Sequence, residues 1–235
     1  MSMDIEEYAR RHRHFYGLEV PSLLEKHLRS ARPQRLMDLG CGDGALLFAL
    51  KQAGLLEDTQ VFAVDNSAER IERVQTIDRG FVCVVDSACR LASFYGATVD
   101  FVISTQVIEH VGDDAEMIRQ VGRVLTPGGM LYLTTVLRKK WAWYFYRNRG
   151  RWVLDPTHVR EYRVETELTN ILRAEGFEIL DSRKTPLRYA PADFLLRRAS
   201  ARRPGAAPGR VLCLLRKFRL PIPGYRNWEL LCRKS

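Results

Sequence analysis

The sequence predicts an open, doubly wound α/β fold whose sheet has seven mostly parallel strands. Short runs that are apolar at nearly every position alternate with helix-like stretches between residues 35 and 135. Such runs are typical of strands buried on both faces, and their alternation with helices indicates a parallel sheet. The chain of 235 residues is 46% hydrophobic and 28% charged, which excludes a disordered, collagen-like or coiled-coil protein.

The expected elements follow in chain order. One or two amphipathic helices are expected in residues 4–30, with a break near Gly17 and Pro21. Five strands are then expected at 35–39, 60–64, 81–85, 99–104 and 129–135. Helices are expected between or after them at 44–53, 67–75, 87–95, 114–125 and 164–175. The last two strands are expected at 177–182 and 228–232.

We expect a single domain over residues 1–235, because one core suits a chain of this length. Its expected parts are N-terminal helices at 1–30 and a cofactor-binding core at 31–182, which contains an aromatic insert at 138–163. A basic insertion at 183–227 and the closing strand at 228–235 complete it.

The excess of positive charge lies at one end of the chain. The net charge is +9, and residues 183–235 carry 14 Lys or Arg against only Asp193 and Glu229. Two short amphipathic stretches lie inside this region, at 192–198 and 210–218. The segment 184–226 is therefore open to three interpretations: a solvated basic lid, a nucleic-acid surface, or a patch that rests on anionic lipid.

The sequence favours a cytoplasmic protein. No window approaches the roughly 18 uninterrupted apolar residues of a membrane-spanning helix, and the charged N-terminus lacks the apolar core of a signal peptide. The five cysteines form no CxxC pair, which suits free thiols in a reducing compartment. A peripheral position at the inner face of the membrane is the alternative that the basic segment suggests.

A glycine-rich loop follows the first expected strand. It runs from Asp38 through Gly40, Gly42 and Gly44, where glycines let the backbone turn tightly and approach a ligand. An acidic residue, Asp65, follows the second strand at the distance expected of a ribose-binding carboxylate. Taken alone, these features indicate a nucleoside-containing cofactor without identifying it.

Five sequence blocks in order resemble the class I S-adenosylmethionine-dependent methyltransferases, in particular the small-molecule, methyltransferase type 11-like group. The resemblance covers residues 34–182 and 228–232. Its blocks are MDLGCGDG at 37–44, VFAVDNS at 61–67, VVDS at 84–87, DFVISTQVIEHV at 100–111 and LTPGGMLYLTT at 125–135. The resemblance implies the Rossmann-like methyltransferase fold and an enzyme of class EC 2.1.1 that converts S-adenosylmethionine to S-adenosylhomocysteine.

The resemblance also implies where the cofactor lies. Asp38 and the backbone at Gly40 and Gly42 would hold its methionine end, and Asp65 would accept hydrogen bonds from both ribose hydroxyls.

Three further cofactor contacts follow from the same resemblance. Asp86 and the Ser87 backbone would meet the adenine edge, and Gln106 would lie beside the sulfonium and the acceptor entrance. Asp and Ser at strand ends and helix starts also serve as structural caps, and this remains the alternative for each of these carboxylates, Asp65 and Asp86 included.

Two histidines are candidate general bases for removing a proton from the acceptor. His110 follows Glu109 after the fourth strand, and His158 lies in the segment DPTHVREY before the helix at 164–175. A structural role is the alternative for each. We predict no metal, because the sequence has no cluster of closely spaced ligands. Glu109, His110 and His158 could converge on a metal only if the fold brings the loop at 158 over the fourth strand.

The predicted function is methyl transfer from S-adenosylmethionine to an oxygen atom of a small-molecule acceptor. The basic segments suggest that this acceptor is phosphorylated or linked to a lipid or a glycan. Three alternatives remain: an RNA or protein methyltransferase that uses 184–226, a non-catalytic binding module with the same fold, and a nicotinamide-dependent oxidoreductase.

Overall fold

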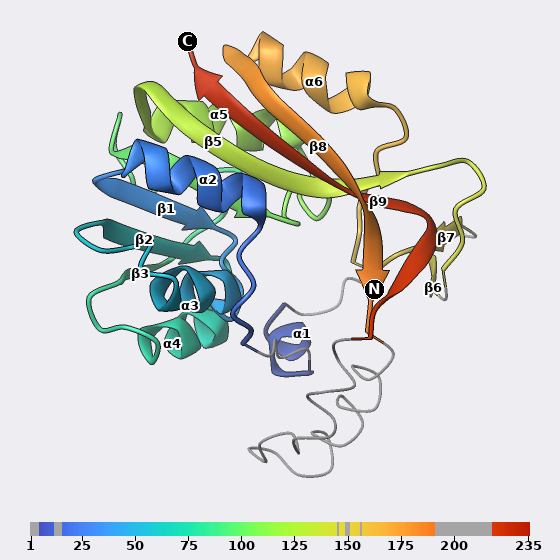
Figure 1. Cartoon of the computed structure of the whole chain (residues 1–235), viewed down its shortest axis with the longest axis horizontal. Helices are drawn as coiled ribbons and strands as arrows, with labels where there is room; N and C mark the ends of the chain where they lie inside the picture. Colours follow the sequence, from blue (N-terminus) through green and yellow to red (C-terminus); the bar gives the residue numbers. More distant parts are fainter. Residues whose placement is uncertain (1–4, 12–15, 145, 149–150, 156, 191–217) are drawn as a thin grey trace.

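The computed structural model describes residues 5–11, 16–144, 146–148, 151–155, 157–190 and 218–235. Seven strands form one twisted sheet in the order β3-β2-β1-β4-β5-β9-β8 (Figure 1). Five of them pair in parallel, whereas β9 runs antiparallel to both of its neighbours, β5 and β8. The predicted fold class is confirmed.

The strands and helices alternate along the first half of the chain. The strands of the large sheet are β1 (Arg35–Leu39), β2 (Gln60–Asp65), β3 (Val82–Val85), β4 (Val99–Thr105), β5 (Leu125–Arg138), β8 (Phe177–Tyr189) and β9 (Leu220–Lys234). A small hairpin is formed by β6 (Tyr146–Asn148) and β7 (Arg151–Val153). The helices are α1 (Ile5–Arg11), α2 (Ser22–Ala31), α3 (Ala45–Gln52), α4 (Ala68–Gln75), α5 (Asp114–Val124) and α6 (Glu165–Ala174).

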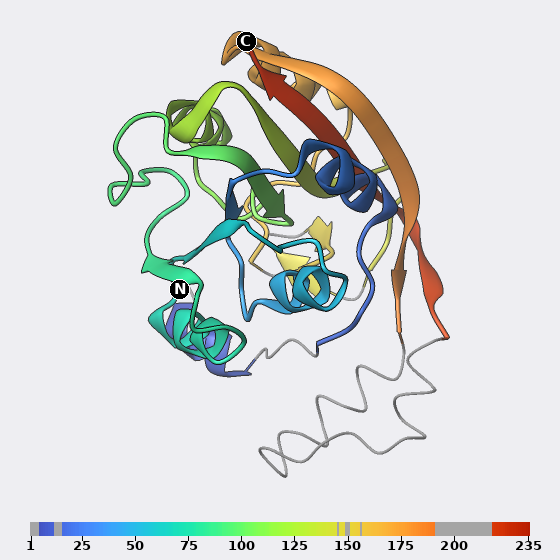
Figure 2. The ribbon, with the colours of Figure 1, turned by 60° about the vertical axis from the view of Figure 1, so that its left-hand side comes forward.

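Each face of the sheet is covered by its own helices. Side chains alternate between the faces along a strand, so Phe101 and Ile103 of β4 face α2, α3 and α4, whereas Val102 faces α5 and α6. The first core includes Leu24, Leu28, Leu47, Leu50 and Ile71, and the second includes Met117, Ile118, Val121, Leu168 and Leu172. The two helical layers are visible in Figure 2.

The helix expected at 87–95 is absent from the structure. The Asp86 side chain binds the backbone of this stretch instead. It accepts hydrogen bonds from the backbone N–H of Ser87 at 2.7 Å and of Ser93 at 2.8 Å. Leu91 adopts a left-handed conformation with φ of 43°, which an α-helix cannot contain. The apolar residues of this stretch therefore do not mark a helix. Leu91 and Phe94 are buried in the core, but they lie in a turn.

The basic insertion is shorter than predicted. Both flanks of the segment 183–227 are strand, because β8 continues to Tyr189 and β9 begins at Leu220. The expected stretches at 192–198 and 210–218 lie outside the described residues apart from Phe218. The aromatic insert at 138–163 contains the β6–β7 hairpin, a short-range pairing that its irregular sequence did not reveal.

A second, small core lies where β8 and β9 extend beyond the main sheet (Figure 1). Ala142, Ile222 and Tyr225 are buried there, and Leu154 and Leu187 pack against them. The extension thus fixes the aromatic insert against the end of β9.

The described helices include none that is both long and apolar enough to cross a lipid bilayer.

Gly224 permits this second core, and its replacement tests the packing. An added Cβ would lie 2.5 Å from Ala142 Cα, and the residue has φ of 76°. In Gly224→Ala we expect the left-handed backbone to cost about 1 kcal/mol and the overlap with backbone to add about 1–3 kcal/mol. Urea unfolding at unchanged m-value measures the loss.

Gly96→Ala is the matched control. Gly96 has φ of 63°, and nothing lies within 4 Å of its added Cβ, so this variant should show the backbone cost alone. Equal losses of unfolding free energy in the two variants would contradict the close approach of Gly224 to Ala142.

Candidate functional site

The glycine loop turns sharply at the carboxyl end of β1. Gly40, Gly42 and Gly44 all have positive φ, at 74°, 55° and 78°. The N–H of Gly40 donates to the Val64 carbonyl at 2.7 Å, which ties the loop to β2. A Cβ at Gly40 would lie 2.3 Å from Val107 Cγ2, so only glycine lets the loop pass the segment after β4.

Asp65 holds this loop in place. Its Oδ2 accepts from the Gly42 N–H at 2.9 Å, and its Oδ1 accepts from the Ser67 N–H at 3.0 Å. The carboxylate is almost fully buried and lies 3.8 Å from Arg70 Nη1. Because each oxygen has a second lone pair, the residue can still accept from hydroxyl groups. Its contact with ribose stays a prediction.

Asp43, the residue after Gly42, also holds the glycine loop in place. Asp43 is buried and forms an ion pair with Arg73 of α4, with 2.7 Å between Oδ1 and Nη1. Its carbonyl accepts from the Tyr16 hydroxyl at 2.9 Å. The loop is therefore rigid before any ligand binds.

Asp38 carries a buried carboxyl group that lacks a partner. Among the described residues, neither of its oxygens receives a hydrogen bond, and the residue is 1% exposed. Burial, together with the charge of Asp65, raises its pKa to about 7. An orphaned carboxyl beside a glycine loop suits a ligand that brings a cationic group, such as an amino acid α-ammonium.

The structure places the other predicted cofactor residues at the same edge of the sheet. Asp86 follows β3 and uses both oxygens to bind backbone N–H groups, including that of Ser87. Burial raises its pKa, but these hydrogen bonds outweigh that effect and lower it. Gln106 follows β4 in a left-handed conformation, with its amide nitrogen donating to Asn227 Oδ1 at 3.1 Å. Adenine and sulfonium contacts for these residues stay predictions.

The segment 155–163 lies over the carboxyl end of β4. The Glu109 carbonyl accepts from the backbone N–H groups of Val159 and Arg160, at 2.9 and 3.2 Å. The Arg160 guanidinium also donates to the carbonyls of Ile108, Val111 and Gly112 and pairs with Asp114. This network brings the second predicted histidine to the first.

Glu109, His110 and His158 meet at this point. One potential ligand atom from each lies within 4.8 Å of the other two, and the two imidazole rings are T-shaped with centroids 4.7 Å apart. Burial raises the pKa of Glu109 to about 7, and burial together with His158 lowers the pKa of His110 to about 4. Near neutral pH, His110 is therefore uncharged and Glu109 is partly protonated.

This cluster can serve two kinds of chemistry. Two imidazoles and one carboxylate are donors that suit a divalent transition metal or zinc. A neutral imidazole in this cluster can also accept a proton from an acceptor hydroxyl. The sequence made metal binding conditional on this convergence, and the fold supplies it. The predicted absence of a metal stays a prediction.

Sequence reasoning missed the residue that holds His158. Glu161 is buried, with its Oε1 3.0 Å from His158 Nδ1. Its only local signal is its position three residues after the histidine. Asn227, the partner of Gln106, carries no local signal because it comes from the far end of the chain.

A cavity of about 840 Å³ opens beside the His158–Glu161 pair. It is bounded by the end of β5, the segment 153–163 and α6, and its lining includes Arg138, Arg160, Tyr162, Arg163 and Ile171. The space is large enough for a small-molecule ligand.

A sequence profile of the methyltransferase domain matches residues 8–182, which is most of the chain and includes the whole glycine-loop half. The chain belongs to the methyltransferase family. It is 30% identical over 175 residues to the ubiquinone biosynthesis O-methyltransferase of Rhizobium rhizogenes, covering 69% of this chain and 68% of that protein. Across such relatives the chain spans between 50% and 68% of their length.

Solved structures share the fold of this methyltransferase. A putative methyltransferase of Bacillus halodurans superposes with a TM-score of 0.63 at 15% identity, over 92% of this chain and all of that one. The 1,6-didemethyltoxoflavin-N1-methyltransferase of Burkholderia thailandensis, solved with S-adenosylhomocysteine, gives 0.55 at 21% identity, over 91% and 76% of the two chains.

The protein is thus a class I enzyme that uses S-adenosylmethionine, and its residues fit that cofactor. The rigid glycine loop and the orphaned Asp38 would hold the methionine end, and Asp65 has acceptor capacity for the ribose. When bound, S-adenosylmethionine supplies an electrophilic methyl group on its sulfonium. The oxidoreductase and non-catalytic alternatives are not supported.

The raised pKa of Asp38 makes cofactor affinity dependent on pH. Below pH 7 the free protein holds this carboxyl protonated, and pairing with an ammonium group requires the proton to leave. We expect the affinity for S-adenosylhomocysteine to rise with pH up to about 7, by at most about tenfold per unit. Calorimetric titration in buffers of different ionisation enthalpy measures both the affinity and the released proton.

Asp38→Asn supplies the control, since it should weaken binding and remove most of the pH dependence. An unchanged pH profile in this variant would show that another group titrates.

Proposed function

We propose that this methyltransferase modifies a hydroxyl oxygen of a small-molecule acceptor, with His158 receiving the hydroxyl proton. The relatives at about 30% identity are named O-methyltransferases, which supports oxygen as the methylated atom. The observation that carries the proposal is the position of His158, which is buried and held over the carboxyl end of β4 beside Glu109 and His110.

Methyl transfer from a sulfonium is an in-line displacement, so the protein mainly has to align the acceptor with the donor. A hydroxyl oxygen becomes a better nucleophile when a base accepts its proton as the bond forms. His158 can take this role because its Nδ1 is engaged by Glu161, while its Nε2 forms no hydrogen bond with the described residues and can face the acceptor.

The cavity beside His158 supports a polar or anionic acceptor. Arg138, Arg160 and Arg163 contribute to its lining, while Val153 and Ile171 add apolar surface. We propose a hydroxylated aromatic or a phosphorylated or lipid-linked acceptor as the classes to screen. The name of the relatives adds ubiquinone precursors to that screen.

A cation at Glu109, His110 and His158 is the second way to activate the acceptor. Their mutual approach within 4.8 Å favours it. A cation there would lower the pKa of a hydroxyl bound to it, and the two nitrogens and one oxygen would be its protein ligands.

His158→Ala tests the proposed base. Removing the imidazole should lower turnover at least about tenfold and leave the affinity for S-adenosylhomocysteine nearly unchanged, since His158 is separate from the glycine loop. The measurement is S-adenosylhomocysteine production with the best acceptor of the screen. Wild-type turnover in this variant would remove His158 from the mechanism.

Treatment with EDTA separates the two modes of activation. If His158 takes the proton unaided, chelation leaves wild-type turnover unchanged. If turnover is lost on chelation and restored by a divalent cation, the cluster acts as a metal site, and Glu109→Gln should then weaken the cation dependence as well as the rate.

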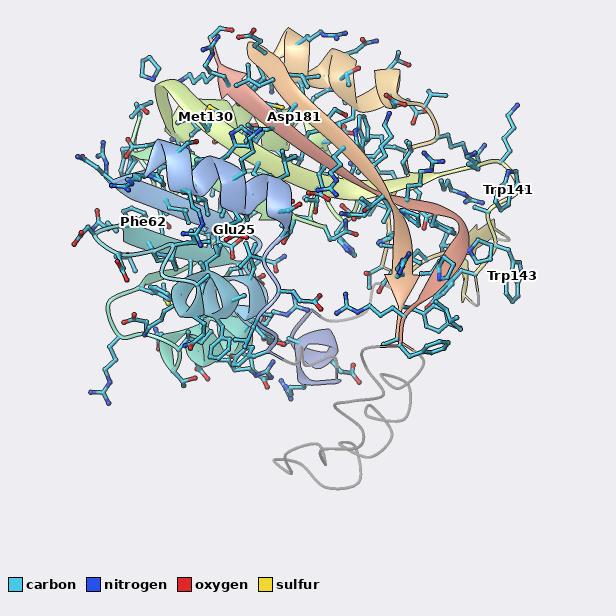
Figure 3. The ribbon with its side chains drawn as sticks, viewed as in Figure 1. Glu25, Phe62, Met130, Trp141, Trp143 and Asp181 are labelled. Carbon is cyan, nitrogen blue, oxygen red and sulfur yellow. The ribbon has the colours of Figure 1, made fainter. Side chains whose placement is uncertain are left out.

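We propose that the enzyme also contacts anionic lipid. Trp141 and Trp143 project from the aromatic insert (Figure 3), with 64% and 45% of their surface exposed. Lys139 lies over the Trp141 ring at 5.9 Å. The described ends of the basic segment, residues 184–189 and 220–226, lie in β8 and β9, which form the same extension of the fold. Exposed Trp beside Lys and Arg is typical of side chains at a membrane interface.

Co-sedimentation with vesicles tests this contact. At low salt the protein should bind vesicles that contain anionic lipid and not neutral ones, and W141A/W143A should bind less while keeping its affinity for S-adenosylhomocysteine. Equal binding of the variant would exclude the tryptophans. Selective methylation of RNA or protein in the acceptor screen would instead assign segment 184–226 to a macromolecular substrate.

A further inference from the structure

Glu161 is a buried acid surrounded by hydrogen-bond donors. Only 4% of its side chain is exposed. Oε1 accepts from the Leu154 N–H at 2.7 Å and lies 3.0 Å from His158 Nδ1. Oε2 accepts from the Tyr225 hydroxyl at 3.0 Å and from Arg138 Nη1 at 3.3 Å. Three donors and one imidazole nitrogen thus surround the two oxygens and fill most of the accepting capacity of a carboxylate.

These donors come from separate parts of the fold. Arg138 ends β5, Tyr225 lies on β9, and Leu154 precedes the histidine in the segment over the site. A carboxylate held from three directions cannot rotate, so the position of Oε1 is fixed relative to the sheet.

The surroundings also keep Glu161 ionised. Oε1 accepts from the Leu154 N–H, and Oε2 lies 3.3 Å from Arg138 Nη1; both of these groups can only donate, so the geometry favours the carboxylate form. An ionised carboxylate has no proton to donate, so in the neutral form of the imidazole the proton resides on Nδ1, facing Oε1. Nε2 then keeps its lone pair.

We propose that Glu161 is a positioning residue, which fixes His158 as the Nδ1–H tautomer and so presents the Nε2 lone pair to the reacting hydroxyl. The catalytic consequence rests on the proposed function of His158, whereas the tautomer does not. A neutral imidazole in water favours the opposite, Nε2–H form, which could neither accept the proton nor bind a cation at Nε2. The carboxylate therefore prepares the histidine for either mode of activation.

The tautomer can be measured without an acceptor. Long-range ¹H–¹⁵N NMR of histidine-labelled protein distinguishes protonated from unprotonated ring nitrogens, and His158→Ala assigns the signal. We expect the Nδ1–H form in the wild type. Glu161→Met removes the acceptor at similar size and should move His158 to the Nε2–H form.

Glu167→Gln is the matched control. Glu167 lines the same cavity, but its carboxylate accepts from the Arg163 N–H and has no bond to His158. It should leave the His158 signals unchanged. An Nδ1–H tautomer that persists in Glu161→Met, or an Nε2–H tautomer in the wild type, would overturn the inference.

Kinetics then link the tautomer to the reaction. Glu161→Met should lower kcat at least about tenfold, with little change in the affinity for S-adenosylhomocysteine. In a His158→Ala background this substitution should not lower kcat further, because Glu161 acts through the missing imidazole. A merely structural role would give additive losses and would lower the melting temperature without changing kcat per folded molecule.

The two levels of the proposal fail separately. If Glu161→Met does not fold, the wild-type spectrum still tests the inference, since an Nε2–H tautomer there contradicts it. If the tautomer depends on Glu161 but His158→Ala keeps full turnover, the proposed function fails and the positioning of the imidazole stands.

Discussion

The parallel pairing of β1 with both β2 and β4 is the constraint on which the rest of the molecule depends. Leu39 pairs with Val64, and Asp38 pairs with Ile103, so the carboxyl ends of these strands reach the same edge of the sheet. The chain leaves β2 toward one side and β4 toward the other, which opens a crevice above β1. The glycine loop, Asp65 and the segment after β4 meet there because this register brings the carboxyl ends of their strands together.

Buried carboxyl groups at this edge differ in the donors that surround them. Asp38 and Glu109 each have at least one oxygen without a partner among the described residues, and burial raises both pKa values to about 7. Asp86 and Glu161 are also buried, but backbone or side-chain donors surround them and lower their pKa values. Asp38 and Glu109 are thus available to bind ligands, whereas Asp86 and Glu161 hold backbone and side chains in place.

The extension of β8 and β9 connects this edge to the acceptor side. Tyr225 of β9 binds Glu161, and Asn227 binds Gln106, so one strand positions residues around both halves of the site. Gly224 lets the same strand pack against Ala142 in the aromatic insert. The small second core therefore supports the site as well as the surface that carries Trp141 and Trp143.

The sequence by itself determined the sheet and the glycine loop that follows its first strand, because these depend on local pattern. Apolar runs marked the strands, and the residues from Asp38 to Gly44 are contiguous. It failed at 87–95, where the Asp86 side chain competes with a helix for backbone N–H groups. Only the tertiary structure decided the surroundings of His158 and Gln106, where we propose that the acceptor binds. Glu161 and Tyr225 are 64 residues apart, and Gln106 and Asn227 are 121 apart, so their contacts follow from strand pairing rather than from any local signal.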